Sequence, residues 1–317
     1  LELIQHPDSK IGAWAIRMLT DAWPLDTIMG SPHPAARSSL YSDSVIKELI
    51  RSAKDDDQSS SKRLYLASAL QRLPLNRRLE LATVLAARAE DGSDHNMPLM
   101  VWYGLLPVAT TDPDGLARFA CSSRFPILTR LIARRLAEMI DEQPQSIEIL
   151  LTGSRTDVLP DLLKGLTEGF AGRHKVKAPA NWSAIQKQIA GSSDDKLKTM
   201  ERDLSVLFGD GRALEQVQRV ALDGKADLAA RRSALQTLID NRAPDRRKIC
   251  EQLLSVRYLN TTAIRGLTEF DDPTIGDKLA RSYRSFFPSD RPAVIDALVT
   301  RASFAEALLE QVAAGKI

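Results

Sequence analysis

The stretch Asp94-His95-Asn96 brings a carboxyl, an imidazole and an amide together, immediately before an uncharged apolar run. A histidine at the mouth of a buried helix could act as a titratable base or contact a ligand, because pKa values shift at such positions. The structural alternative is that Asp94 or Asn96 caps a helix with Pro98 in its first turn, and that His95 satisfies a neighbouring turn. We favour the structural alternative, because one histidine without a second ligand type nearby is a weak signal.

Four clusters of basic residues are the second feature that could do chemistry: Arg77-Arg78, Arg134-Arg135, Arg231-Arg232 and Arg246-Arg247-Lys248. If they lined one concave groove of a helical protein, phosphate binding would follow. Acidic residues lie close to them in the sequence (Glu80, Asp240, Asp245, Glu251) and favour paired, solvated helix faces instead. The net charge of +2, from 43 basic and 41 acidic residues, does not indicate a nucleic-acid partner.

Other catalytic or metal-binding patterns are weak. His6, His33 and His174 are too far apart in the sequence to predict a metal site, and we expect the only cysteines, Cys121 and Cys250, to be buried thiols. The sequence has no Gly-x-Ser-x-Gly elbow and no Cys-x-x-Cys-His haem attachment motif. We explain its glycine pairs as helix ends. We therefore expect no catalytic, cofactor-binding or metal-ligating residue in this chain, and no enzyme activity of its own.

The composition predicts the elements that position these residues. The chain has 317 residues, of which 44% are hydrophobic and only 5% aromatic, and it is rich in Ala, Leu and Arg. This mixture favours helices over sheets, so the predicted class is all-α. No apolar run is long enough to cross a bilayer. The first residue is not Met, and we expect the chain to be a segment of a longer protein.

Helical periodicity places the main features. The run from Met97 to Val108 predicts a helix that is apolar, and buried, on every side. Residues 24–42 predict a loop. Near the N-terminus, one apolar helix face is predicted from the residues Ile11, Trp14, Ala15, Met18 and Leu19. A later helix begins at Pro126, with outward Arg130, Arg134 and Arg135 and with the inward residues Leu128, Leu131, Ile132, Leu136 and Ile140.

The last third of the chain has the clearest repeat. Ile249 and Leu279 are 30 positions apart, and Leu279 and Leu308 are 29 apart, on the second helices of successive predicted pairs. A two-helix unit of this length is typical of HEAT repeats. We predict an α-α superhelix, a HEAT/ARM-like solenoid of antiparallel helix pairs. Its predicted parts are an irregular half (1–172), a basic linker with short helices (173–200) and regular repeats (201–317).

Several segments resemble the helical-repeat region of large membrane-bound dehydrogenase or haem-binding multidomain proteins of Planctomycetes and Verrucomicrobia. The resemblance depends mainly on the stretch from Asp94 through Trp102 to Gly104, and it extends to other segments: His6-Pro7-Asp8 through Leu19, Leu73-Pro74, Arg134-Arg135-Leu136, and the Pro179 to Trp182 step. In such proteins a sorbosone-dehydrogenase-like propeller precedes this region and a c-type cytochrome domain follows it. Neither is present in this chain.

The resemblance implies a non-catalytic scaffold that positions the neighbouring domains of an exported protein in the periplasm or cell envelope. Its partners would be the propeller, the cytochrome domain or other proteins, and nucleic acid only under the alternative hypothesis. The residues that we predict for an interaction surface are His95, Asn96, Trp102, Arg134, Arg135, Arg231 and Arg232.

Overall fold

The computed structural model describes residues 1–21, 23–25, 42–55 and 59–317. Within these residues every regular element is a helix and none is a strand, so the all-α prediction is confirmed. Most of the predicted loop at 24–42 lies outside the described residues, and so does His33.

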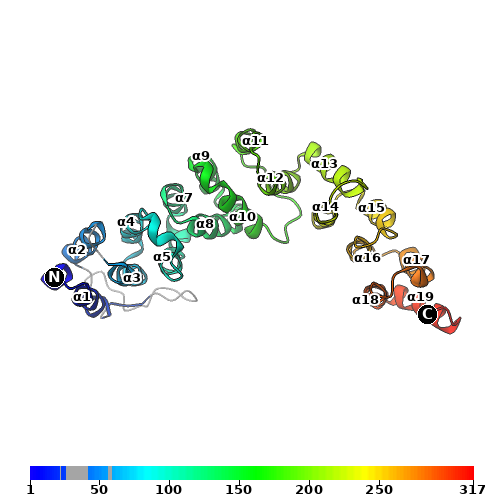
Figure 1. Cartoon of the computed structure of the whole chain (residues 1–317), viewed down its shortest axis with the longest axis horizontal. Helices are drawn as coiled ribbons and strands as arrows, with labels where there is room; N and C mark the ends of the chain where they lie inside the picture. The colour runs from blue at the N-terminus through cyan, green and yellow to red at the C-terminus, as the bar shows by residue number, and fades with distance from the viewer. Residues whose placement is uncertain (22, 26–41, 56–58) are drawn as a thin grey trace. The chain divides into compact units, whose positions relative to one another are not determined.

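The chain divides into two compact units (Figure 1). Unit 1 comprises residues 1–171 and 179–200, and unit 2 comprises residues 172–178 and 201–317. The helices of unit 1 are η1 (Glu2–Gln5), α1 (Ser9–Asp21), α2 (Asp43–Lys54), α3 (Ser60–Ala69), η3 (Leu70–Arg72), α4 (Leu75–Leu85), η4 (Ala89–Ser93), α5 (Met97–Leu105), α6 (Val108–Thr111), α7 (Pro113–Ser122), α8 (Pro126–Glu138), α9 (Pro144–Gly153), η5 (Thr156–Val158), α10 (Leu159–Gly169) and α11 (Trp182–Ala190).

Helix α12 (Asp195–Leu207) contributes residues to both units. The remaining helices of unit 2 are α13 (Gly211–Leu222), α14 (Leu228–Asp240), α15 (Arg246–Leu253), α16 (Asn260–Leu267), α17 (Pro273–Arg281), η6 (Tyr283–Ser285), α18 (Arg291–Leu298) and α19 (Ala302–Ala313). The predicted domain boundaries at 172 and 200 stay predictions.

The helices of unit 1 form two rows (Figure 1). One row runs α1, α3, α5, α8, α10, and the other runs α2, α4, α7, α9, each helix packing on the next member of its row. The α8–α10 contact is particularly close, because a Cβ at Gly165 or Gly169 would collide with backbone carbonyl oxygens of α8. Small residues at four-residue spacing therefore bring two backbones together.

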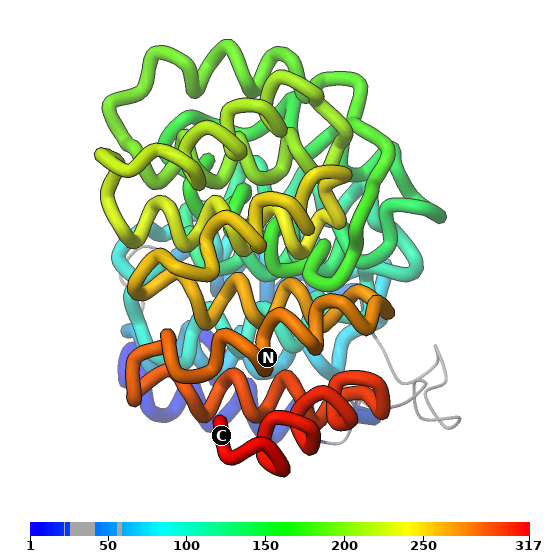
Figure 2. Tube along the Cα trace, turned by 90° about the vertical axis from the view of Figure 1, so that its right-hand side faces the viewer, coloured from blue at the N-terminus to red at the C-terminus, as the bar shows by residue number. Residues whose placement is uncertain are grey.

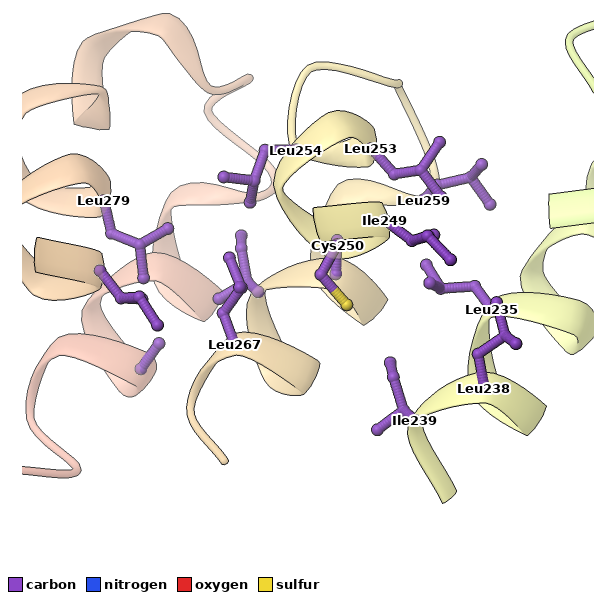
Figure 3. Close-up of a cluster of buried hydrophobic side chains, with 14 of the residues drawn as sticks. Leu235, Leu238, Ile239, Ile249, Cys250, Leu253, Leu254, Leu259, Leu267 and Leu279 are labelled. Atoms are coloured by element: carbon purple, nitrogen blue, oxygen red, sulfur yellow. The ribbon is translucent and has the colours of Figure 1, made fainter. Parts of the chain in front are cut away.

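In unit 2, α13 packs on α14, α15 on α16 and α17 on α18, while α14, α16 and α18 also contact one another in order. These helices lie side by side in the Cα trace (Figure 2). Apolar side chains from successive pairs fill the space between them, with Leu235, Leu238 and Ile239 facing Ile249 and Cys250 (Figure 3). The 30-residue spacing is thus a spacing of core positions, since Ile249 and Leu279 are both buried.

Two sequence predictions about burial were wrong. In α1 the buried residues are Gly12, Ala13, Ile16 and Thr20, whereas Ile11, Trp14 and Met18 of the predicted apolar face are exposed. Small residues let α1 approach its neighbours, and the larger side chains point away. In α5, Val101 and Leu105 are buried but Tyr103 is 37% exposed, so this helix is not buried on every side.

The inward face that we predicted for α8 is largely correct. Leu128, Ile132, Leu136 and Ile140 are buried, and only Leu131 is partly exposed. The predicted glycine helix ends are also confirmed where the backbone requires them. Gly172 and Gly209 have φ values of +81° and +85°, which an L side chain rarely adopts.

Candidate interaction surface

The stretch before α5 is a helix cap. The Asp94 carboxylate Oδ1 accepts hydrogen bonds from the backbone N–H groups of Met97 (2.7 Å) and Asn96 (2.8 Å). These amides hold the pKa of Asp94 below its usual value. With Pro98 in the first turn, the geometry agrees with the structural alternative, in which Asp94 is the capping residue.

The candidate residues His95, Asn96 and Trp102 lie on and just before α5. His95 and Asn96 are exposed and Trp102 is partly exposed, next to the half-exposed Tyr103. The helix is fixed beneath them, because α5 packs on α3, α4 and α8. The exposed side of α5 therefore presents aromatic rings and an imidazole from a firmly packed helix.

Arg134 and Arg135 lie on α8, which packs on α5, and both contact the carboxylate of Glu138. Arg134 Nε is 3.4 Å from Glu138 Oε1, and Arg135 Nη1 is 3.0 Å from Glu138 Oε2. Arg130 of the same helix forms a two-pronged ion pair with Glu168 of α10, which lowers the pKa of Glu168. The arginines of α8 thus stabilise the helix and its contact with α10.

Arg231 and Arg232 lie in unit 2 and donate hydrogen bonds to backbone carbonyl groups. Arg231 is only 8% exposed, and its Nε donates a hydrogen bond to the carbonyl of Ala221, in the last turn of α13 (3.2 Å). Arg232 donates from Nε and Nη2 to the carbonyl of Tyr258 (3.2 and 3.1 Å). Both were predicted as possible interaction-surface residues, and the burial of the Arg231 side chain leaves little of it accessible to a partner.

The sequence marked Arg78 only as part of a basic cluster and did not predict its structural role. Arg78 is 3% exposed, and its guanidinium donates to three carbonyl oxygens: those of Leu73 (2.9 Å), Gly104 (2.8 Å) and Gln71 (3.3 Å). These carbonyls lie at the ends of η3 and α5, where no helical N–H is available to them. Arg78 therefore joins α4 to both elements as a buried C-terminal cap.

The same use of arginine recurs along the chain. Other guanidinium groups also donate to carbonyls at or just after the ends of helices: Arg72 to Trp23, Arg88 to Asp55, Arg155 to Ser123, Arg284 to Gly315 and Arg301 to Thr268. At the opposite helix ends, aspartates accept from backbone amides, as Asp112, Asp210, Asp227 and Asp272 do. Much of the charge in this chain stabilises helix ends.

The remaining basic clusters are paired in a similar way. Arg77 contacts Asp43 (2.7 Å) and Glu80 (3.0 Å). Arg247 contacts Asp272 (2.8 Å) and Glu251 (3.0 Å). The paired, solvated helix faces that the nearby acids predicted are present at these clusters.

Neither the thiols nor the surface hollows suggest a reaction centre. Burial raises the pKa of Cys250 to about 12 and also raises the pKa of Cys121, which is only partly exposed. Within the described residues no group of three His, Cys, Asp or Glu side chains could hold a metal ion. One open hollow is lined by Lys54, Thr83, Arg88 and Glu90 among others, and a second lies along α13.

A second group that sequence reasoning missed lies in unit 2. Arg257, Tyr258 and Phe287 form an exposed cluster in which the guanidinium lies over both rings. A signal for it exists in the sequence, since Tyr258 and Phe287 are 29 positions apart, which is the repeat spacing of the core leucines. That spacing was applied only to apolar core positions, and the two aromatic residues were left out.

No family model, no curated protein and no solved structure matches this chain. The resemblance to the dehydrogenase-associated helical regions stays a prediction. In the described part of the chain, no helix combines the length and the apolar character that a membrane span requires.

Proposed function

We propose that this chain is a HEAT-like α-solenoid that acts as a non-catalytic scaffold and binds other protein domains. The observation that carries the proposal is the pattern of helix contacts, in which two rows of helices in unit 1 and the row α14, α16, α18 in unit 2 pack in order along the chain. In solenoids each helix pair buries its apolar face on its neighbours, and the flanks of the rows remain available for partners.

The engagement of the arginines supports a structural role for the charged residues. Arg78, Arg231 and Arg301 donate to backbone carbonyls, and Arg77 and Arg247 are paired with carboxylates. Side chains engaged in this way stabilise the helix pairs that a scaffold needs.

By the resemblance, the scaffold belongs to a larger exported protein of the dehydrogenase/c-type cytochrome kind and positions its neighbouring domains. This would place it in the periplasm or cell envelope. We assign the contact to the exposed side of α5 and the residues before it, where His95, Asn96, Trp102 and Tyr103 are accessible. Aromatic residues on a rigid helix are frequent anchors of protein interfaces.

Isothermal titration of the 317-residue chain with the propeller and cytochrome domains that the resemblance predicts for the full-length protein tests this assignment. We expect Trp102→Ala to weaken binding of one of these domains by roughly tenfold or more, because tryptophan anchors often dominate interface energies. His95→Ala should have a smaller effect in the same direction. Trp14→Ala is the matched control, since Trp14 is an exposed tryptophan of the same row on α1.

Two outcomes would overturn the assignment. Neither domain binds the wild-type chain, or both His95→Ala and Trp102→Ala bind with wild-type affinity. Circular dichroism of each variant confirms that a loss of binding is not a loss of fold.

The nucleic-acid alternative, with arginine clusters in a concave groove, stays a prediction with less support. Among the cluster residues, Arg78 and Arg231 are buried, and Arg134, Arg135 and Arg247 have carboxylate partners. Binding to duplex DNA that falls steeply with added salt would revive it.

A further inference from the structure

The cluster of Arg257, Tyr258 and Phe287 differs from the other arginine sites. The Arg257 guanidinium carbon lies 4.6 Å from the centre of the Tyr258 ring and 4.8 Å from the centre of the Phe287 ring. The two rings are 50% and 47% exposed. They come from different connections, Tyr258 from the one between α15 and α16, and Phe287 from the one between α17 and α18.

Within the described residues, Arg257 has no carboxylate or carbonyl partner. Other stacked arginines of unit 2 do have one. Arg246 lies over Phe270 and also contacts Glu269 (3.6 Å), and Arg291 lies over Tyr283 and donates to the carbonyl of Phe286 (3.2 Å). The N–H donors of Arg257 are thus oriented by two rings but left unused.

The cluster is also held in place. Tyr258 has a φ of +68°, a strained conformation for a bulky residue, and Arg232 fixes it by two hydrogen bonds to its carbonyl. The next residue, Leu259, is fully buried in the core (Figure 3). Tyr258 is therefore presented from anchored backbone, which lowers the entropy lost on binding.

A partly buried hydrogen bond joins the first residue of α16 to the connection before α18. Asn260, 3% exposed, donates from Nδ2 to Asp290 Oδ2 at 2.6 Å. The other oxygen of Asp290 accepts from Ser289 Oγ at 3.1 Å. This carboxylate, the closest in sequence to Phe287, is thus held by Asn260 and Ser289, and within the described residues it is not paired with Arg257.

We propose that Arg257, Tyr258 and Phe287 form a docking site for an acidic peptide segment of a partner protein. A Glu or Asp carboxylate would accept two parallel hydrogen bonds from the Arg257 guanidinium. An apolar side chain next to it would pack on the exposed parts of the two rings. This site lies in unit 2 and does not depend on the role proposed for α5.

Charge complementarity favours a peptide over a nucleic-acid strand. A strand presents a row of phosphates and needs a row of available cations. The arginines near this cluster, Arg232, Arg284 and Arg291, already donate to the carbonyls of Tyr258, Gly315 and Phe286. One available guanidinium between apolar rings fits a single carboxylate with an apolar neighbour.

Fluorescence anisotropy with a labelled peptide, Gly-Glu-Trp-Glu-Leu-Glu-Gly, tests the proposal. We expect saturable binding to the full chain and none for the counterpart with Gln in place of Glu. Arg257→Gln should weaken binding by roughly tenfold or more, the effect of losing one charge-assisted pair. Arg257→Lys keeps the positive charge but loses the two parallel N–H donors of the guanidinium. Its affinity should therefore lie between those of Arg257→Gln and the wild type.

The matched control is Arg265→Gln, since Arg265 is an exposed arginine of α16 that lies over no aromatic ring in the described part of the chain, and it should bind as the wild type does. Tyr258→Gly removes one ring at a backbone conformation that glycine accepts, so its loss of binding cannot be attributed to new strain. Equal binding of Arg257→Gln and wild type, equal binding of the Glu and Gln peptides, or tighter binding of an oligo-dT strand would each overturn the proposal.

Discussion

The α8–α10 contact of unit 1 and the contact around Gly266 in unit 2 are both made possible by glycine, but they differ in what the glycine faces. A Cβ at Gly165 would meet the Arg130 carbonyl, a part of the α8 backbone. A Cβ at Gly266 would meet Ile239 Cδ1 at 2.6 Å and Cys250 Sγ at 2.8 Å, the ends of side chains. The α8–α10 contact is therefore limited by the distance between two helix backbones. The contact around Gly266 is limited by the side-chain conformations of Ile239 and Cys250.

The two units also differ in how deeply they use arginine. In unit 1, Arg78 donates to three carbonyls at two helix ends. In unit 2, Arg231 donates to the single carbonyl of Ala221. One buried guanidinium thus holds three backbone carbonyls in unit 1, whereas in unit 2 the buried Arg231 holds one.

Substitution of the buried arginines should give the largest difference in stability between the two units. We expect Arg78→Met to lower the free energy of unfolding of unit 1 by about 3–5 kcal/mol, because three buried carbonyls lose a charged donor. Arg231→Met should cost unit 2 only about 1–2 kcal/mol, because one hydrogen bond is lost. Urea unfolding followed by hydrogen exchange in each unit measures both.

Arg77→Met is the control for the first substitution, since Arg77 has partly exposed carboxylate partners and should cost less than about 1 kcal/mol. Similar losses for Arg78→Met and Arg77→Met would show that the carbonyl contacts contribute little.

The glycine substitutions should give the next largest effect. Gly165→Ala should destabilise unit 1 by about 3 kcal/mol, because α8 and α10 must move apart. Gly266→Ala should destabilise unit 2 by about 1 kcal/mol, because Ile239 and Cys250 can change rotamer. Thermal unfolding of the two variants gives the order, and a larger loss for Gly266→Ala would contradict the comparison.

The smallest effects should appear in the pH dependence, where one carboxyl group of each unit contributes with the opposite sign. The ion pair with Arg130 lowers the pKa of Glu168 in unit 1, so its stabilisation is present above the unfolded pKa and is lost as pH falls through the folded one. Burial raises the pKa of Asp203 in unit 2, so its contribution is complete below the unfolded pKa and is lost as pH rises through the folded one.

Unfolding at several pH values between about 3 and 7, with hydrogen exchange reporting on each unit, measures both slopes in the range where carboxyl groups titrate. Glu168→Gln should remove part of the acid sensitivity of unit 1. Asp203→Asn should remove the loss of stability with rising pH that Asp203 contributes to unit 2. Unchanged slopes in both variants would mean that other carboxyl groups dominate.

The sequence predicted what depends on local periodicity. The all-α class and the buried stripe of α8 at Leu128, Ile132 and Leu136 follow from apolar residues at helical spacing. A cap at Asp94 or Asn96 was predicted from residue type and the nearby Pro98, and in the structure the Asp94 carboxylate accepts from the helix amides. These features are decided within one helix turn of the residue that signals them.

The predictions that were wrong concern features that depend on the neighbouring helix. Nothing in the periodicity of α1 indicates that Ala13 and Ile16 are buried while Trp14 and Met18 are exposed, because a tight approach of helices favours small residues over large ones. The role of Arg78 required knowing that the end of α5 lies 26 residues away in sequence but within hydrogen-bond reach. Periodicity carries no such information.

The Arg78 cap has a consequence for how this part of the molecule responds to its surroundings. A buried lysine or histidine at this position could release its proton and lose hydrogen bonds to the carbonyls. A guanidinium stays protonated, and keeps its donors, at every pH that a cell presents. Titration of Arg78 therefore cannot break the contact of α4 with η3 and α5. A change of pH can destabilise unit 1 only through other titratable groups.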